Sequence, residues 1–219
     1  MFDLKNVSYF YEGKVKALDD VTLHIDRGQS VAIVGANGCG KTTLLRLLNG
    51  LIFPSSGTYT FDGDLVTRET LANTKFAKTF HRRVGFVFQN ADAQLFCGSV
   101  EDEIAFGPRQ LNIDESEIHR RVDDCLELLD IVHLRQRAPY ALSGGEKRRV
   151  AFACVLALNP DALVADEPLA SLDAAGKKLV VDLFKALHGA GKTIVFASHS
   201  EELIAEVADL RFSVEASAQ

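Results

Sequence analysis

A glycine-rich segment, Gly35–Thr42, carries the first chemistry that the sequence indicates. It reads Gly-Ala-Asn-Gly-Cys-Gly-Lys-Thr and fits the pattern G-x-x-x-x-G-K-[ST]. The glycines let backbone N–H groups turn inward around phosphate oxygens, and a following helix adds the positive end of its dipole. Lys41 is expected to reach the terminal phosphates, and Thr42 to offer its hydroxyl to Mg²⁺. The segment predicts a nucleoside triphosphate site, which ATPases, GTPases and kinases share.

Two adjacent carboxylates follow the apolar run Ala162–Ala165. The first, Asp166, suits Mg²⁺, either directly or through water. The second, Glu167, is placed to take a proton from an attacking water molecule. Two solvated acids at a strand end are common, so the pair alone is weak evidence for catalysis. The phosphate loop elsewhere in the chain is what supports a catalytic role for it. Together they predict hydrolysis of the bound nucleotide.

The turn Leu142-Ser143-Gly144-Gly145-Glu146 combines helix-capping chemistry with two glycines. Ser143 and Glu146 have the spacing of a capping box for a helix that runs through Leu158. Small residues at a helix N-terminus also form a good anion site. The turn is therefore expected to cap its helix and to be open to a phosphate from outside the chain.

The elements that must position these residues alternate along the chain. Period-two or apolar runs predict strands at Val7–Tyr11, Val21–Ile25, Ser30–Val34, Thr58–Phe61, Val84–Phe88, Ala162–Ala165 and Thr193–Ala197. Helical spacing and capping predict helices at Thr42–Leu48, around Ile118–Leu129, at Ser143–Leu158, at 174–188 and from Glu201. This alternation indicates an α/β fold with a parallel sheet. We expect one domain over 1–219, with a nucleotide core (1–89 and 160–219) and a helical lobe (90–159).

Composition excludes several classes of protein. The 219 residues carry a net charge of −6, which argues against a coat for nucleic acid. None of the four cysteines lies in a C-x-x-C pair, so neither a zinc site nor a disulfide framework is indicated. The longest apolar run, Val150–Leu158, is far shorter than a bilayer span, and the N-terminal residues do not have the pattern of a signal peptide.

These segments, in this order, resemble the ATP-binding subunit of ATP-binding cassette (ABC) transporters over nearly the whole chain. The resemblance implies a P-loop NTPase core of the ABC ATPase type, with an antiparallel β subdomain and a helical subdomain. It implies ATP and Mg²⁺ as ligands, and a sandwich of two subunits in which the Ser143 turn closes on ATP held by the other subunit. The nucleotide-binding residues that it implies are Tyr11, Gly35, Asn37, Gly38, Cys39, Gly40, Lys41, Thr42, Thr43, Ser143, Gly145 and Asp173.

The same resemblance assigns the catalytic roles. Glu167 would be the general base, His199 would hold the γ-phosphate, and Gln89 would contact both Mg²⁺ and the attacking water. Thr42, Gln89 and Asp166 would be the metal ligands. Taken singly, Gln89 and His199 are ordinary polar residues, and Phe10 is an alternative to Tyr11 as the residue that stacks on adenine. Their offsets from the stronger motifs support the assignments.

A narrower resemblance rests on Val84–Phe96 and Ser99–Pro108. Both segments are similar to the ATPase of energy-coupling factor (ECF) transporters, which import cobalt or nickel ions and vitamins such as biotin. This implies a peripheral protein on the cytoplasmic face of the membrane, acting through a transmembrane coupling subunit and, indirectly, a substrate-capturing membrane subunit. The surface expected to dock on the coupling subunit is Asp92, Gln94, Leu95 and Phe96, although Leu95 and Phe96 could instead be core residues.

Three other interpretations remain open at this stage. The chain could power a conventional importer that uses a binding protein, it could be a soluble ABC ATPase acting on nucleic acid, or it could be a P-loop kinase. The turn at Ser143 disfavours the kinase, and the acidic net charge disfavours nucleic acid as a partner. Since every group needed for hydrolysis is present in one chain, we expect a homodimer with two complete sites, or a pair with a paralogous ATPase.

Overall fold

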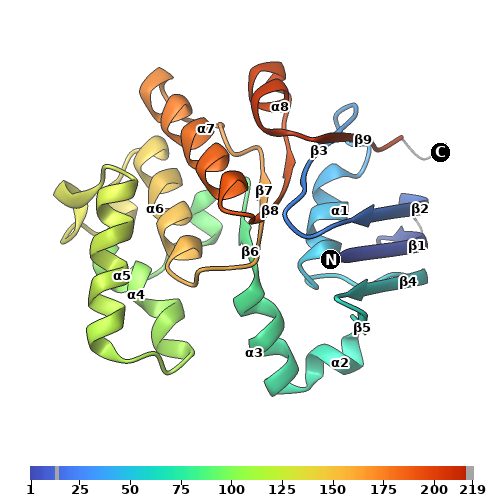
Figure 1. Cartoon of the computed structure of the whole chain (residues 1–219), viewed down its shortest axis with the longest axis horizontal. Helices are drawn as coiled ribbons and strands as arrows, with labels where there is room; N and C mark the ends of the chain where they lie inside the picture. The colour runs from blue at the N-terminus through green and yellow to red at the C-terminus, as the bar shows by residue number, and fades with distance from the viewer. Residues whose placement is uncertain (13–14, 216–219) are drawn as a thin grey trace.

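The computed structural model describes residues 1–12 and 15–215, which form two β-sheets with helices packed around them (Figure 1). The larger sheet is parallel, with the strand order β6-β7-β8-β3-β9. Its strands are β3 (Ser30–Val34), β6 (Val84–Val87), β7 (Ala162–Asp166), β8 (Thr193–Ala197) and β9 (Leu210–Ser213). The central strands β7 and β8 are buried along their whole length, as strands of a parallel sheet covered on both faces must be.

The smaller sheet is antiparallel, with the strand order β2-β1-β4-β5. Its strands are β1 (Phe2–Phe10), β2 (Lys16–Ile25), β4 (Ser56–Phe61) and β5 (Asp64–Leu65). Helix α1 (Lys41–Leu48) contacts β2 of this sheet and also β7 and β8 of the parallel sheet. It therefore lies between the two sheets, and its leucines join a core shared by both.

The remaining helices lie on both sides of the parallel sheet: the first two pack with α1 and the antiparallel sheet, and the other five pack on the opposite face (Figure 1). They are α2 (Arg68–Ala72), α3 (Thr74–Arg83), α4 (Val100–Gln110), α5 (Glu115–Leu128), α6 (Gly144–Leu156), α7 (Ala174–Gly189) and α8 (Glu201–Val207). Short 3-10 turns lie at Ala91–Ala93, Val132–Leu134 and Pro139–Ala141. Helices α4, α5 and α6 pack on one another at the end of the molecule opposite the antiparallel sheet.

Two hydrophobic cores divide the side chains of β7 between them. Ala162 and Val164 belong to the core with α1 and the antiparallel sheet, whereas Leu163 and Ala165 belong to the core with the helices α4 to α8. Successive side chains of a strand point to opposite faces of the sheet, so an unbroken apolar run serves both cores. Asp166, which ends this strand, is thereby held at a fixed edge of the sheet.

The predicted elements are confirmed at every position, with shifts at their ends. The strand predicted at Val7–Tyr11 begins at Phe2, and the helix predicted after Ser143 ends at Leu156. The sequence pattern does not indicate α2, α3 or α4. Helix α4 contains Gly107-Pro108, which normally stops a helix, but burial of its apolar side against α6 keeps it helical. The division into a core and a helical lobe at 90–159 stays a prediction.

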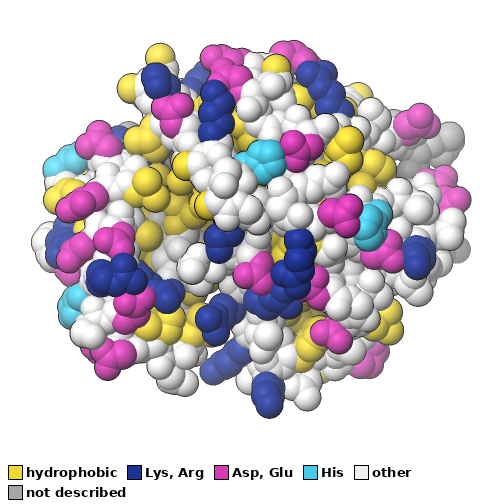
Figure 2. All heavy atoms as spheres, viewed as in Figure 1, with side chains coloured by type: hydrophobic (Ala, Val, Ile, Leu, Met, Phe, Trp, Pro, Cys, Tyr) yellow, Lys and Arg dark blue, Asp and Glu magenta, His cyan; other side chains and the backbone are white. Residues whose placement is uncertain are grey.

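The surface carries one concentration of basic side chains on the face shown. Figure 2 shows Lys and Arg side chains gathered over α3, between the helical end of the molecule and the antiparallel sheet. Lys75, Lys78 and Arg82 of this helix are exposed. Over the part of the chain that the structure describes, no helix combines the length and the apolar character needed to cross a bilayer.

Candidate functional site

The phosphate loop connects β3 to α1 and places Lys41 at the first turn of that helix. Gly40, the N-cap of α1, has φ +108°, and a Cβ atom there would lie 2.3 Å from the carbonyl oxygen of Ala17. Only glycine satisfies both constraints, because L-residues avoid this φ and the space is closed. The buried side chain of Lys41 donates to the carbonyl oxygens of Gly35 (2.8 Å) and Ala36 (2.9 Å), so its ammonium group lies over the loop.

Thr42 joins the phosphate loop to the end of β7. Its hydroxyl donates to Oδ2 of Asp166 at 2.7 Å, although 124 residues separate the two. Asp166 is 3% exposed, so its carboxylate faces the loop rather than solvent. This pair of hard oxygen ligands suits Mg²⁺, which binds through few protein oxygens and takes its others from water and substrate phosphates. The residues present therefore fit the metal that the motif implies.

Glu167 follows Asp166 in a constrained backbone conformation. Its φ is +47°, which is uncommon for a residue other than glycine. The backbone N–H of Glu167 donates to the carbonyl oxygen of Ala197 at the end of β8 (2.9 Å), and this contact fixes the turn. His199 comes two residues after β8, and its Nε2 lies 3.5 Å from Oε1 of Glu167. Carboxyl ends of parallel strands meet at one edge, which explains how these distant residues converge.

The pKa of Glu167 is raised above its usual range, mainly because burial disfavours the charged carboxylate. The neighbouring Asp166 raises it further, whereas His199 and Lys41 oppose the shift. A carboxylate with a raised pKa is a stronger base when it is ionised, which suits a residue that must accept a proton from water.

This pKa shift predicts the acid side of the pH profile for hydrolysis. A general base at Glu167 has to be ionised to accept a proton, so its assignment predicts that kcat falls as pH decreases, and that the fall begins above the ordinary glutamate range. Replacing His199 by alanine removes an interaction that lowers the pKa, so the same fall should shift to higher pH. The measurement is kcat at saturating ATP against pH. An inflection at or below the ordinary glutamate pKa would contradict the role of burial.

A cavity of about 590 Å³ brings most of the predicted site together. Its lining includes eleven predicted site residues: Tyr11, Asn37, Gly38, Gly40, Lys41, Thr42, Thr43, Gln89, Asp166, Glu167 and His199. Tyr11 is half-exposed, and its hydroxyl lies 3.1 Å from Oγ1 of Thr43. Three residues that the motifs do not indicate, Val15, Lys16 and Ala17, complete the wall. Their only sequence signal is their position shortly after Tyr11.

Two predicted residues of the phosphate loop lie outside the lining of this cavity. Gly35 and Cys39 do not line this cavity with side chains. Cys39 is 2% exposed, and its Sγ would lie 2.7 Å from a Cβ atom at Gly35. The thiol therefore fills the interior of the loop, and the neighbouring amides remain the groups available to phosphate.

Ser143, Gly145 and Asp173 lie outside the cavity of their own chain. Ser143 caps α6, accepting from the backbone N–H of Glu146 (3.3 Å), and Oε2 of Glu146 accepts from the N–H of Ser143 (2.7 Å). Asp173 caps α7 by accepting from the N–H of Gly176. Both Ser143 and Asp173 are exposed. These three residues are therefore not part of the nucleotide cavity of their own chain.

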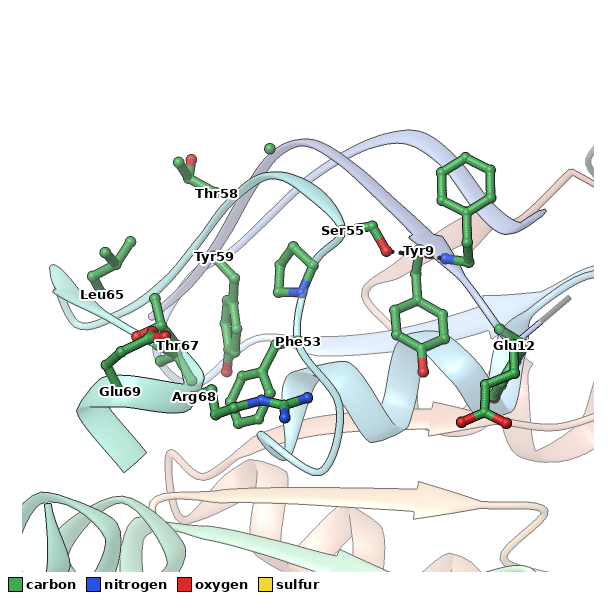
Figure 3. Close-up of a pocket in the computed structure, with 15 residues that line it drawn as sticks. Tyr9, Glu12, Phe53, Ser55, Thr58, Tyr59, Leu65, Thr67, Arg68 and Glu69 are labelled. Carbon is green, nitrogen blue, oxygen red and sulfur yellow. Dashed lines mark hydrogen bonds between the residues drawn. The ribbon is translucent and has the colours of Figure 1, made fainter. Parts of the chain in front are cut away.

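A larger cavity of about 900 Å³ borders the nucleotide cavity and shares Tyr11 with it. Figure 3 shows Tyr9, Phe53 and Tyr59 in this cavity, with the Arg68 side chain beside Phe53. The Arg68 guanidinium lies 5.9 Å from the centre of the Phe53 ring. Neither the phosphate loop nor the Asp166–Glu167 pair lines this cavity. The smaller cavity is therefore the candidate site for the triphosphate.

Comparison with known proteins agrees with this geometry. Residues 18–170 match the family model described as ABC transporter. The chain is 46% identical to the nickel import ATP-binding protein LarO of Lactiplantibacillus plantarum, over 95% of this chain and 86% of LarO. It is 42% identical to the energy-coupling factor transporter ATP-binding protein EcfA of Methanoculleus marisnigri, over 95% of this chain and 74% of EcfA.

A solved structure gives the same result for the fold. The chain superimposes with a TM-score of 0.90 on an ATP-binding cassette solved as a dimer in a post-hydrolysis state with ADP and Pi, at 28% identity. The match covers 99% of this chain and 95% of that one. The P-loop core with an antiparallel and a parallel sheet is confirmed. The chain belongs to the ABC transporter family, as one of its ATP-binding, ATP-hydrolysing subunits.

Proposed function

We propose that this protein is the ATPase of an ECF-type importer of nickel or cobalt ions, or of a vitamin such as biotin. The observation that carries the proposal is that two features meet just after the end of β6: Gln89 lines the nucleotide cavity, and the neighbouring Phe88 lines a groove with exposed aromatic side chains. The names of LarO and EcfA support the choice of cargo and transporter type. On this proposal the protein lies on the cytoplasmic face of the membrane, held there by transmembrane partner subunits.

The hydrolytic step follows from the positions of the site residues. Lys41 and the loop amides hold the phosphates, and Tyr11 stacks on adenine. Thr42, Gln89 and Asp166 would hold Mg²⁺, which neutralises phosphate charge when bound. Glu167 orients a water molecule for in-line attack and takes its proton, while His199 donates to the γ-phosphate. Each of these roles is part of the proposal.

The functional unit is proposed to be a dimer that encloses two ATP molecules. Ser143 and Asp173 are exposed, Gly145 is partly exposed, and none of the three lines the cavity of its own chain, so they are available to the nucleotide of a second subunit. One chain contains the whole set, which favours a homodimer; a paralogous ATPase is the alternative partner. The related cassette with ADP and Pi is itself dimeric, which supports this arrangement.

The proposed docking surface lies beside Gln89, in a groove of about 270 Å³ that we call the aromatic groove. Its rim includes Leu51, Phe96 and Phe106, all of them exposed. Phe96 is 68% exposed and meets Phe106 edge-on, with ring centroids 5.0 Å apart. Large apolar side chains exposed together mark a site of interaction. The occupant that we propose is a helix of the transmembrane coupling subunit.

The residues predicted for docking play different parts around this groove. Phe96 is on its rim. Gln94 turns inward, where its side chain accepts from the N–H of Phe88 and donates to the carbonyl of Phe86. Leu95 is half-buried against the helical core, and Asp92 pairs with Lys147 at 2.6 Å. We therefore propose Phe96 as the contact residue and the other three as its support.

Buried Glu103 holds Phe96 in place. It is 4% exposed, and its Oε2 accepts from the backbone N–H groups of Phe96 (2.8 Å) and Cys97 (2.5 Å). Two hydrogen bonds to one buried oxygen fix the loop backbone, while the Phe96 ring stays at the surface.

The test is affinity capture of the tagged chain from detergent-solubilised membranes of its native host, followed by mass spectrometry. We expect one transmembrane coupling subunit and a small substrate-capturing membrane protein. Paired permeases with a binding protein would indicate a conventional importer instead. Recovery with nucleic acid or ribosomes, and with no membrane protein, would contradict the proposal.

Substitutions in the aromatic groove let the same experiment test the docking site itself. Replacing Phe96 and Phe106 by serine should lower recovery of the coupling subunit about 10-fold or more, because a large buried aromatic side chain contributes on the order of 2 kcal/mol to an interface. The matched control is Val132→Ser, which changes an exposed apolar residue away from the groove. Equal recovery with both proteins would exclude the groove as the docking site.

A further inference from the structure

Three consecutive basic residues, Lys147, Arg148 and Arg149, follow the Ser143 turn on α6, and their side chains contact different parts of the chain. Lys147 pairs with Asp92, and Arg149 donates to the carbonyls of Leu129 and Asp130. Arg148 is 2% exposed, and among the described residues no carboxylate lies within ion-pair distance of it. A buried cation without a paired anion is unfavourable unless other groups satisfy its donors. The partners of Arg148 therefore indicate its role.

Those partners are two consecutive carbonyl groups in the segment that carries Gln89. The Nη1 atom of Arg148 donates to the carbonyl oxygen of Phe88 and its Nη2 atom to that of Gln89, both at 2.5 Å. A guanidinium group is a rigid planar fork, so two bonds to neighbouring carbonyls fix the backbone in position and orientation. The side chain of Gln89 remains exposed in the nucleotide cavity.

Two further contacts complete the attachment of this segment. Lys147, next to Arg148 on α6, holds Asp92 at the far end of the segment. On the other side, Gln94 bridges the backbone of Phe86 and Phe88. The segment from Phe88 to Asp92 is thus bound to α6 by two adjacent side chains, and α6 begins directly at the Ser143 turn.

The charges that act on Arg148 indicate that it lies near Asp166 and Glu167. Burial lowers the pKa of Arg148, and the charges of Asp166 and Glu167 oppose that shift. The guanidinium group therefore lies within the electrostatic influence of both carboxylates, although it lines neither the nucleotide cavity nor the aromatic groove. It cannot contact the nucleotide directly from this place.

We infer that Arg148 is a positioning residue that makes the Gln89 segment move together with helix α6. The inference rests on the proposed function, in which the Ser143 end of α6 contacts the nucleotide of the second subunit. A displacement of α6 at one nucleotide is then transmitted through the guanidinium fork to Gln89 at the other. Arg148 thereby couples the two sites of the dimer and sets the position of Gln89 for turnover.

The experiment measures ATP hydrolysis and nucleotide binding by the purified full chain and three variants. In Arg148→Gln, kcat should fall about 10- to 100-fold, the range expected when a catalytic group is displaced by about 1 Å. The Kd for ATP should change less than about twofold, because Arg148 does not reach the nucleotide, and the Hill coefficient should fall towards 1. Arg148→Lys should recover part of kcat, since an ammonium group can donate to one of the two carbonyls.

The matched control is Arg121→Gln. Arg121 is partly buried and, like Arg148, donates to a backbone carbonyl, that of Ala157 (2.8 Å), but this contact is at the opposite end of α6 from the Ser143 turn. It should retain wild-type kcat and cooperativity. A purely structural effect of losing an arginine–carbonyl contact would appear in both glutamine variants.

The outcomes separate this inference from the proposed function. If the wild-type chain neither dimerises nor hydrolyses ATP, the proposed function fails. If the wild type is active and folded Arg148→Gln matches it in kcat and Hill coefficient, the inference alone is overturned. Should Arg148→Gln fail to fold, Arg148→Lys decides: a lower kcat at unchanged ATP affinity supports the role, and wild-type kcat and cooperativity overturn it.

Discussion

Replacing Glu167 by glutamine is expected to lower kcat for ATP hydrolysis by about 10²- to 10⁴-fold, the range for loss of a general base. ATP binding should persist, because glutamine has the same shape and Lys41 and the loop amides are unchanged. The half-buried carboxylate lies next to Asp166 and 3.5 Å from His199, so it is held at the edge where the phosphate loop ends. The nucleotide-bound dimer should accumulate, since its opening requires hydrolysis.

The measurements for Glu167→Gln are steady-state hydrolysis, ATP affinity and dimer formation with ATP by size-exclusion chromatography. The control is Glu127→Gln, which changes an exposed acid on α5 outside the nucleotide cavity. Turnover by Glu167→Gln that approaches the wild-type rate would remove Glu167 from its role. Loss of ATP binding together with turnover would instead indicate that the carboxylate shapes the cavity.

Replacing Lys41 by alanine is expected to raise the Kd for ATP about 10- to 150-fold, the loss of about 1.5–3 kcal/mol that accompanies removal of a hydrogen bond to a charged group. Lys41 is 9% exposed, and its ammonium group already lies at the carbonyls of Gly35 and Ala36. Because binding is lost, the ATP-dependent dimer should also be lost. This separates Lys41→Ala from Glu167→Gln, which should keep the dimer.

The measurement for Lys41→Ala is equilibrium binding of a fluorescent ATP analogue, with thermal unfolding to establish that the protein is folded. Lys177→Ala is the matched control, because Lys177 is exposed on α7 and does not line the cavity. Wild-type affinity in folded Lys41→Ala would show that the loop amides bind the phosphates without the lysine, and would contradict its proposed role.

Local features of the sequence were sufficient to predict the main elements and the phosphate loop. Hydrophobic period and capping residues located β7 and α6, because both signals act within a few residues of chain. These local signals do not indicate α3, because Phe80 is the one buried side chain among its ten residues and the hydrophobic period is weak. They do not indicate α4 either: Gly107-Pro108 is a local signal for a helix end, whereas the packing against α6 that keeps the segment helical is a long-range contact.

The sequence does not predict which of the proposed docking residues faces the partner. A run of polar and apolar residues at Asp92–Phe96 indicates a surface but cannot assign each side chain a direction. In the fold, Gln94 lines the aromatic groove but bonds to Phe86 of β6, Asp92 pairs with Lys147, and Phe96 lies exposed on the rim of the groove. These directions depend on α4 and α6, which approach the loop from later in the chain.

The sequence by itself determined which chemical groups the protein has and how each is presented locally. The spacing of Gly35–Thr42 sets the phosphate loop, and Asp166 must end a buried strand, because covalent neighbours and short-range hydrogen bonds suffice for both. The tertiary structure alone decided which groups meet. The Thr42–Asp166 contact spans 124 residues, and Arg148 reaches Gln89 from 59 residues away. Such contacts arise from the packing of the sheet and helices, a property of the whole chain that no local pattern encodes.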